Sequence, residues 1–230
     1  MKGKLFVCAT PIGNLGDASS RLIEVLRTVD LILAEDTRLT RKLLAANQIS
    51  TRMLCLERRR ESQMIPRVVG WLTEGKSIAL VSDAGTPGLS DPGQQLIPRV
   101  IDRGIDVEYI PGPSAIIAAL ILSGLPLHTF LFHAFPPASG GPRRRLFQSL
   151  AGLKATLVFF ESPHRLLSSL DDLQATLGDR RAAVCREMTK LHEEILRGHI
   201  SEITASLALR PRLQGEITIV VEGVGSHLTA

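Results

Sequence analysis

Apolar residues occur along this chain in short consecutive runs. In the first half of the chain, these runs are separated by segments whose apolar residues have helical spacing. The runs lie at residues 4–9, 29–34, 51–56, 78–81 and 107–110. Strands that are apolar at successive positions are typical of a sheet buried on both faces. Their alternation with amphipathic helices predicts a parallel sheet covered by helices on both sides.

The pattern changes after about residue 115. Further strand-like runs lie at 130–135, 155–160, 182–185 and 215–221, and helical spacing occurs at 116–122, 146–150, 166–173 and 200–207. Residues 195–198 are predicted to pair back as a hairpin, so this half returns by hairpins as well as by helices. The sequence therefore predicts an α/β protein with two domains, residues 1–113 with a parallel sheet and residues 114–230 with a mixed α+β sheet.

The loop that follows the fourth apolar run, residues 82–93, contains three glycines and two prolines among Asp, Ser and Thr. Glycine lets a ligand approach the backbone closely, and proline stiffens the loop. Ligands of open α/β sheets bind at the carboxyl ends of the strands, where this loop lies. The loop is therefore predicted to bind a ligand, and the alternative is an ordinary strand-to-helix turn.

Two further loops follow the first and fifth runs. Residues 111–115 read Pro-Gly-Pro-Ser-Ala, and Ser114 is expected to cap a helix whose first N–H groups can bind an acceptor; a plain turn with a cap is the alternative. In the first loop, Gly13 and Gly16 match part of a dinucleotide fingerprint, but Pro11 stands where a tight glycine turn is needed. A nucleotide-dependent oxidoreductase is therefore the least favoured function.

Composition narrows the class of protein further. The net charge of +4 permits an anionic partner. The arginines at 58–60 and 143–145, the latter in an expected flexible loop, are either solvated or bind phosphate. The cysteines Cys8, Cys55 and Cys185 lie far apart, so we expect small core residues of a cytosolic protein rather than disulfides.

No charged leader or long apolar run occurs in this sequence, so neither a signal peptide nor a membrane helix is expected. His164 has no second histidine at ligand spacing, so no metal site is expected.

Six blocks carry a family resemblance when they are read in order: Thr10–Leu15, Ala34–Arg38, Ser82–Pro87 with Asp91–Gly93, Pro111–Ala115, Glu161–Arg165 and Arg186–Lys190. Together they resemble the ribosomal RNA branch of the tetrapyrrole methylase, or class III methyltransferase, superfamily. The resemblance covers about residues 5–224. Two blocks, Thr10–Asn14 and Glu161–Arg165, resemble the ribosomal branch in particular.

The resemblance implies a tetrapyrrole methylase fold with S-adenosylmethionine held in a cleft between the two domains of each chain of a homodimer. It implies transfer of a methyl group to the ribose 2′-oxygen of a cytidine in the decoding region of small-subunit (16S) RNA, with that RNA or the 30S subunit as partner. By match, the cofactor contacts are Pro11, Asp83, Ala84, Gly85, Thr86, Pro87, Ser114, Ala115, Met188, Gly215 and Ile217.

A ribose hydroxyl is a poor nucleophile, so a base or a nearby cation should help it to ionise. The catalytic candidates at strand ends are Lys190, Glu161, Glu35 and Asp36, and Glu187 is also considered. Lys190 could act as a base if desolvation lowers its pKa. For each of these residues a structural ion pair is the alternative.

The predicted contacts to RNA are the arginines that suit phosphate: Arg38, Arg58, Arg59, Arg60, Arg143, Arg144, Arg145, Arg165 and Arg186. Relatives in the ribosomal branch tend to carry a His/Asn-bearing segment at Glu57–Glu61, often carry Tyr at Phe160, and often continue beyond the last strand. Two other functions stay open: a class III methyltransferase that acts on a tetrapyrrole, whose carboxylates also suit arginine, and a non-catalytic binding protein with the same fold.

Overall fold

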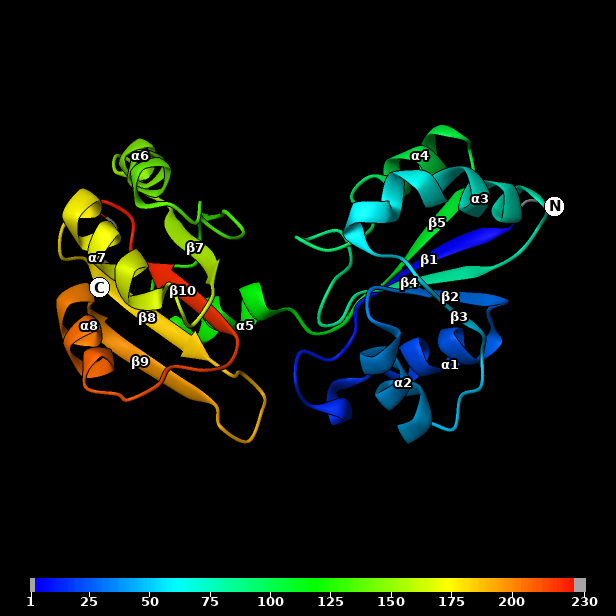
Figure 1. The fold of residues 1–230 in the computed structure, drawn as a ribbon, viewed down its shortest axis with the longest axis horizontal. Helices are drawn as coiled ribbons and strands as arrows, with labels where there is room; N and C mark the ends of the chain where they lie inside the picture. Colours follow the sequence, from blue (N-terminus) through cyan, green and yellow to red (C-terminus); the bar gives the residue numbers. More distant parts are fainter. Residues whose placement is uncertain (1–2, 226–230) are drawn as a thin grey trace. The chain divides into compact units, whose positions relative to one another are not determined.

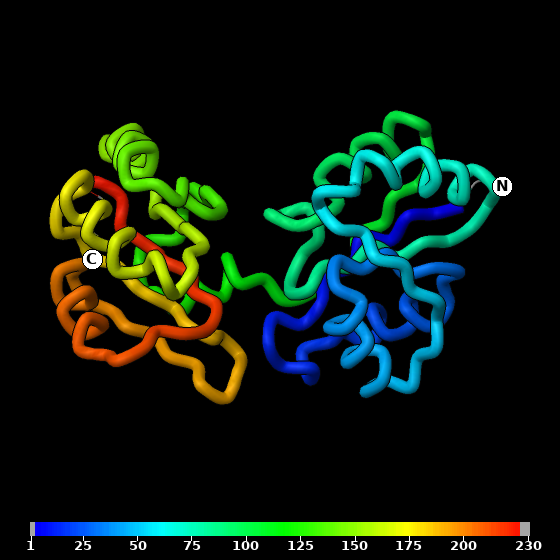
Figure 2. The backbone as a smooth tube through the Cα atoms, viewed as in Figure 1, coloured from blue at the N-terminus to red at the C-terminus, as the bar shows by residue number. Residues whose placement is uncertain are grey.

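A computed structural model of the protein describes residues 3–225. The chain divides into two compact units, Met1–Ser114 and Ala115–Ala230. Each unit contains one five-stranded sheet with helices packed against it (Figures 1 and 2).

The sheet of the first unit is entirely parallel, with strand order β3-β2-β4-β1-β5. Its strands are β1 (Lys4–Cys8), β2 (Leu31–Ala34), β3 (Met53–Cys55), β4 (Ile78–Val81) and β5 (Asp106–Ile110). Helices α1 (Ser20–Thr28) and α2 (Thr37–Ala46) pack on one face, and α3 (Glu61–Thr73) and α4 (Leu96–Asp102) on the other (Figure 1). The predicted parallel sheet with helices on both faces is confirmed.

Strands β1 and β4 lie side by side, but the chain leaves them in opposite directions. From β1 the chain crosses through α1 to β2, on the far side of β4. From β4 it crosses through α4 in the opposite direction to β5, on the far side of β1. The carboxyl ends of two such strands form a topological switch point, the usual ligand position in an open α/β sheet. The loops after β1 and β4 therefore lie where a site is expected.

Side-chain caps explain where helices α1 and α2, on one face of this sheet, begin. The Ser19 hydroxyl caps α1 by accepting the Leu22 N–H at 3.1 Å, and the Asp36 carboxylate caps α2 by accepting the Arg38 N–H at 2.8 Å. The sequence predicts a helix over 37–47 with Leu39, Leu43 and Leu44 on its inward face, and this prediction is partly wrong. Leu39 is 43% exposed, and Thr40 takes the inward position because it lies three and four residues before Leu43 and Leu44.

The second unit has a mixed sheet, as predicted, with strand order β6-β7-β10-β8-β9. Its strands are β6 (Phe130–Phe132), β7 (Thr156–Glu161), β8 (Arg181–Arg186), β9 (Glu194–His199) and β10 (Ile217–Val221). Only β6 and β7 pair in parallel among the described strands of this sheet, and β9 returns beside β8 as the predicted hairpin.

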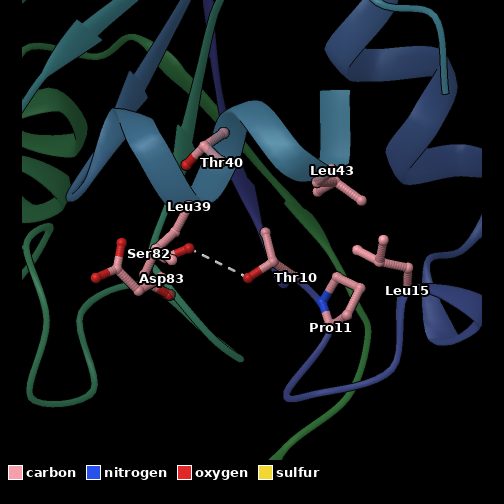
Figure 3. A pocket seen from close by; sticks show the side chains of 8 residues that line it. All are labelled: Thr10, Pro11, Leu15, Leu39, Thr40, Leu43, Ser82 and Asp83. Atoms are coloured by element: carbon pink, nitrogen blue, oxygen red, sulfur yellow. Dashed lines mark hydrogen bonds between the residues drawn. The ribbon is translucent and has the colours of Figure 1, made fainter. Parts of the chain in front are cut away.

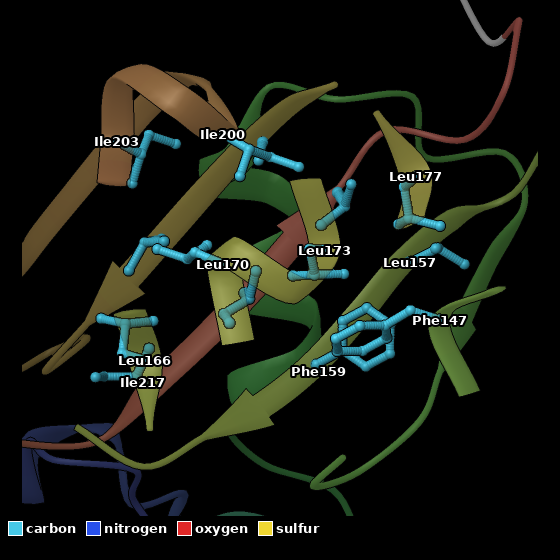
Figure 4. Packing of buried hydrophobic residues seen from close by; sticks show 14 of the residues in the cluster. Phe147, Leu157, Phe159, Leu166, Leu170, Leu173, Leu177, Ile200, Ile203 and Ile217 are labelled. Carbon is cyan, nitrogen blue, oxygen red and sulfur yellow. The ribbon is translucent and has the colours of Figure 1, made fainter. Parts of the chain in front are cut away.

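One face of this sheet carries three helices, α6 (Gly140–Leu150), α7 (Leu166–Leu177) and α8 (Ile200–Ala208). Phe147, Phe159 and Leu170 are fully buried in the core beneath them (Figure 4). Helix α5 (Ala115–Ser123) packs against the opposite face.

The flexible loop expected through residue 145 is largely helical instead. Helix α6 begins at Gly140, and Pro142 lies in its first turn, where a missing N–H costs no helical hydrogen bond.

Candidate functional site

The loops that follow β1 and β4 are joined by backbone hydrogen bonds. Thr10 donates its N–H to the Gly85 carbonyl at 2.9 Å, and Gly85 donates back at 3.1 Å. The Thr10 hydroxyl also donates to the Ser82 carbonyl at 3.2 Å. Gly85 has a φ of +71°, a conformation that a side chain disfavours. The two predicted ligand loops are thus one connected structure with little side-chain bulk.

The loop after β4 is anchored at its far end by the buried carboxylate of Glu61, the last residue of the charge run at 57–61, for which the sequence leaves open a solvated face or a phosphate contact. Glu61 is 1% exposed, and its Oε1 accepts the N–H groups of Gly93, Gln95 and Leu96 at 2.9, 3.0 and 2.8 Å. A carboxylate with three N–H donors holds this backbone firmly. The run is therefore divided: the arginines at 58–60 are exposed, and Glu61 is structural.

Three carboxylates gather where β2 and β4 end. Burial, together with the nearby charges of Asp91 and Asp83, raises the pKa of Glu35 to about 7, and Arg58 opposes this shift to a smaller extent. Burial, together with Asp83, raises the pKa of Asp91 to about 6, although the Ser82 hydroxyl opposes this shift. Burial also raises the pKa of Asp83. This end of the sheet therefore has a negative field that favours a cation.

Asp36, the neighbour of Glu35, behaves in the opposite way. Its carboxylate accepts hydrogen bonds from the Arg38 side chain and from the Arg38 backbone N–H, which lower its pKa to about 2. Asp36 also donates its backbone N–H to Asp83 Oδ1 at 2.9 Å. A carboxylate of such low pKa is a weak base, so Asp36 is a connector between the two loops.

A cavity of about 60 Å³ lies between α2 and the loops after β1 and β4 (Figure 3). The side chains around it are Thr10, Pro11, Leu15, Leu39, Thr40, Leu43, Ser82 and Asp83. Pro11 and Asp83, which the sequence analysis assigned to the cofactor, both border this cavity. Leu39, Thr40 and Leu43 reach it from α2, and the sequence analysis did not predict their part in a site.

In the second unit, the predicted residues also meet at one end of the sheet. Ile217 at the start of β10 pairs with Glu161 at the end of β7 and with Arg186 at the end of β8. Gly215 has a φ of +94°, and a Cβ there would lie 2.5 Å from the Glu187 side chain, so this position requires glycine. Met188 is 7% exposed and packs beside α5.

Glu161 is buried in this unit, and donors surround its carboxylate. Oε1 accepts the Ser162 N–H at 2.7 Å and pairs with the Arg165 guanidinium at 2.7 Å, while Oε2 accepts the Ser169 hydroxyl. These bonds hold the turn that presents the exposed His164. The geometry favours a structural role for Glu161 over the catalytic role we considered.

Lys190 is also held by carboxylates. Its Nζ lies 2.9 Å from Glu187 Oε1 and 3.2 Å from Glu216 Oε2. Burial disfavours the charge on Lys190, but the two carboxylates together outweigh burial and raise its pKa. Lys190 is therefore a cation at neutral pH, and the condition we set for its use as a base, a lowered pKa, is not met.

The predicted RNA-binding arginines fall into two groups. Arg143 is 4% exposed and pairs with Asp172 at 2.6 Å, Arg165 pairs with Glu161, and Arg186 lies 3.1 Å from Glu194. Arg38 is exposed but pairs with its neighbour Asp36. The remaining predicted arginines are exposed to solvent: Arg58, Arg59, Arg60, Arg144 and Arg145.

Three smaller expectations concern other chemistry. Cys8 and Cys185 are buried as expected, whereas Cys55 is exposed, which corrects its assignment to the core. Across residues 3–225, no group of three or more His, Cys, Asp or Glu side chains has an arrangement that could hold a metal ion. Over the same residues, every helix is too short or too polar to span a bilayer.

Comparison with known proteins identifies the class. The sequence model of the family named tetrapyrrole (corrin/porphyrin) methylases matches residues 4–204. The chain therefore belongs to this family of methyltransferases. The structure is similar to that of the methyltransferase CobJ, with a TM-score of 0.72 and 17% identity over 96% of this chain and 95% of that one. At this identity the likeness establishes the fold, and it confirms the fold that we predicted.

Two relatives that are 46% and 47% identical to this chain narrow the comparison within the family. The chain is 46% identical over 227 residues to ribosomal RNA small subunit methyltransferase I of Halalkalibacterium halodurans, covering 99% of this chain and 78% of the relative. It is 47% identical over 221 residues to the protein of that name from Thermotoga maritima, covering 96% and 99%. The predicted resemblance to the ribosomal branch is confirmed.

S-Adenosylmethionine is the cofactor of this class of enzyme, and when bound it supplies an electrophilic methyl group. The first unit has features that fit it. The Glu35, Asp83 and Asp91 carboxylates suit a cationic sulfonium and an ammonium group. The bridge between Thr10 and Gly85 holds the two loops together, and Gly85 adds no side chain that a nucleoside would have to avoid.

Proposed function

We propose that this enzyme transfers a methyl group from S-adenosylmethionine to the ribose 2′-oxygen of a cytidine in the decoding region of 16S ribosomal RNA. The observation that carries this proposal is the identity of 46–47%, over almost the whole chain, to two proteins named for the methylation of small-subunit ribosomal RNA. Because ribosomal RNA is the substrate, the proposed location is the cytoplasm, with the 30S subunit or its RNA as partner.

The proposed proton acceptor is Glu35. The 2′-hydroxyl must lose its proton as the carbon–oxygen bond forms, and a base with a pKa close to the working pH does this most efficiently. Glu35 has a pKa of about 7 and lies beside the proposed cofactor loop, close enough for Asp83 to raise its pKa. Among the other candidates, Asp36 is too weak a base, Glu161 is enclosed by donors, and Lys190 is protonated.

The proposed cofactor contacts in the first unit are Pro11, Ser114 and the loop from Asp83 to Pro87. The roles of Ala115, Met188, Gly215 and Ile217, which belong to the second unit, stay predictions. The proposed contacts with RNA are reduced to the exposed arginines at 58–60, 144 and 145. Arg143, Arg165 and Arg186 are at most partly exposed and are engaged by carboxylates, and Arg38 is held by Asp36. Arg144 also pairs with Asp172 but is more than half exposed.

The proposed assembly is a homodimer. Helix α5 is built from nine residues that read Ala-Ile-Ile-Ala-Ala-Leu-Ile-Leu-Ser, apolar on every side. One side packs on its own sheet, but Ile117 and Ile121 are 51% and 63% exposed on the other side. A helix that is apolar all round is normally covered, and a second copy of this chain is the proposed cover.

The test is methylation with labelled S-adenosylmethionine. Unmodified 30S subunits should accept one methyl group per particle, and mass mapping of the RNA should place it on the ribose of a single cytidine. A uroporphyrinogen in the parallel reaction should stay unlabelled. Label in the tetrapyrrole would replace the proposed substrate with that of the wider family, and cofactor binding without label in either would indicate a non-catalytic protein.

A further inference from the structure

The cavity in the first unit contains a polar group that the described structure leaves without a partner. Thr40 is 5% exposed, and its hydroxyl has no hydrogen-bond partner among the described residues. Figure 3 shows it reaching from α2 toward the loop after β4. A buried polar group without a partner costs about 1–3 kcal/mol, so its presence at a cavity indicates a missing ligand atom.

A second polar group at the cavity also has bonding capacity left. Asp83 Oδ1 accepts the Asp36 N–H at 2.9 Å, and a carboxylate can accept more bonds than this one. When it is ionised, the Asp83 carboxylate can accept hydrogen bonds but cannot donate them. The cavity thus offers a hydroxyl, which can donate or accept, and a carboxylate, which accepts.

The other walls are apolar and the space is small. Pro11, Leu15, Leu39 and Leu43 border the cavity. Its volume of about 60 Å³ compares with roughly 10–15 Å³ for one water-sized group, so it holds about four to six such groups. This is enough for part of a pyrimidine, since cytosine has eight non-hydrogen atoms, and it is far below the roughly 300–1,000 Å³ of sites that enclose a whole drug-sized ligand.

We propose that this cavity receives the base of the target cytidine and that the Thr40 hydroxyl and the Asp83 carboxylate recognise its hydrogen-bonding edge. The proposal rests on the proposed function. Cytosine presents an amino donor next to a ring acceptor, which complements a carboxylate next to a hydroxyl. Uracil presents a carbonyl in place of the amino group. Its carbonyl oxygen would face the carboxylate, and two acceptors cannot form a hydrogen bond with each other. Proteins that recognise RNA by sequence hold unstacked bases in this manner, on apolar surfaces and by their edges.

Holding the base also positions the reacting atom. Pro11 and Asp83 belong to the proposed cofactor loops and to the wall of this cavity. Glu35, the proposed proton acceptor, lies near Asp83: burial and the charges of Asp91 and Asp83 together raise the pKa of Glu35. A cytosine held in this cavity would keep its ribose next to the proposed cofactor loops and to Glu35. Alignment of this kind supplies much of the rate of a displacement reaction.

The first test compares Thr40→Val, which has the same shape without the hydroxyl, with Thr40→Ser, which retains it. Thr40→Val should lower kcat/KM for unmodified 30S subunits about fivefold to tenfold, the effect of one lost hydrogen bond. Thr40→Ser should stay within about twofold of the wild-type protein. The calorimetric Kd for S-adenosylmethionine should be unchanged in both.

The second test fills the cavity from its exposed side. Leu39 borders the cavity but is 43% exposed, so Leu39→Trp adds bulk without disturbing the core. It should abolish methylation of 30S subunits and leave cofactor affinity unchanged.

The third test asks which base is accepted. Reconstituted 30S subunits that carry uridine at the mapped position should be methylated at least tenfold more slowly than those with cytidine. Asp83→Asn should reduce this ratio, because an amide can donate to the uracil carbonyl. Comparison of the two bases with one variant removes any effect of the substitution on the cofactor.

Three results would overturn the proposal. Wild-type kinetics in both Thr40→Val and Leu39→Trp would show that no base enters the cavity. A parallel loss of cofactor affinity would assign the cavity to the cofactor. If the wild-type protein does not methylate small-subunit RNA at all, the proposed function fails and this proposal fails with it, whereas the first two results leave the proposed function intact.

Discussion

At the scale of single residues, carboxylates of similar intrinsic strength have different properties because their surroundings differ. The pKa of Glu35 is raised to about 7 by burial and two neighbouring charges, and that of Asp36 is lowered to about 2 by hydrogen bonds from Arg38. Glu161 is enclosed by donors from its own turn and from α7. Of the carboxylates we considered, Glu35 therefore has the properties of a proton acceptor at neutral pH.

Glu35→Gln should lower kcat for 30S subunits by about 10²–10⁴-fold, the usual contribution of a general base. In the wild-type protein, kcat/KM should rise with pH as the Glu35 carboxyl loses its proton near pH 7, and it should level off above that value. Steady-state rates between pH 5 and 9 would measure both effects. Asp36→Asn is the matched control, because its pKa of about 2 leaves no titration in this range. A wild-type pH profile in Glu35→Gln with normal turnover would remove Glu35 from the reaction.

At the scale of elements, carboxylates join segments that are distant in the sequence. Glu61 begins α3, yet it accepts three N–H groups from the loop and helix start at Gly93, Gln95 and Leu96. Asp172 of α7 pairs with Arg143 of α6 at 2.6 Å, and both side chains are buried. The first interaction supports the proposed ligand loop, and the second fixes two helices on one sheet.

Glu61→Ala should lower the free energy of unfolding by about 2–4 kcal/mol, because three N–H groups lose a charged acceptor. Urea unfolding followed by circular dichroism would measure it. Glu57→Ala removes an exposed carboxylate from the same run and should change stability by less than about 0.5 kcal/mol. An equal, small effect of both substitutions would show that Glu61 does not hold the loop.

Arg143→Ala and Arg145→Ala should separate stability from RNA binding. Arg143→Ala leaves Asp172 with Arg144 as its remaining partner and should destabilise the protein by about 3 kcal/mol. Arg145 is exposed, so its loss should leave stability unchanged but weaken binding to small-subunit RNA and reduce the salt dependence of that binding. Urea unfolding and filter binding at several salt concentrations would test this. A stable Arg143→Ala protein with weakened RNA binding would return Arg143 to the RNA contacts.

At the scale of the whole molecule, two five-stranded sheets of different topology carry the predicted residues, and both gather them at one end of the sheet. In the first unit this end is where β1 and β4 diverge. In the second it is where β7, β8 and β10 pair through Glu161, Arg186 and Ile217. The exposed side of α5 is the surface that we assign to a second copy of the chain.

Ile121→Asp should convert the proposed dimer to a monomer, because it places a charge in the centre of a covered apolar surface. Light scattering coupled to size exclusion would measure the mass. Leu209→Asp is the control, since Leu209 is 87% exposed at the end of α8 and lies outside the proposed surface. A monomeric wild-type protein, or an unchanged dimer in Ile121→Asp, would contradict the assignment.

The sequence by itself determined the order and type of most elements, because runs such as 78–81 are apolar at every position and can only be buried. It also determined the family and predicted the loop at 82–93 as a ligand site, since the six ordered blocks and the glycines and prolines of that loop depend on residue type alone. It misassigned the start of α6 and the inward face of α2, where proline and threonine occur at positions that helices tolerate.

Only the tertiary structure decided the role of each charged side chain. Glu61 is buried because the loop around Gly93 folds back on it. Lys190 stays protonated because the carboxylates of Glu187 and of Glu216, which lies just before β10, are both next to its ammonium group. Likewise, Thr40 borders a cavity only because α2 packs beside the loops after β1 and β4. Burial and charge pairing depend on residues that are distant in the chain, and the local pattern contains no record of those partners.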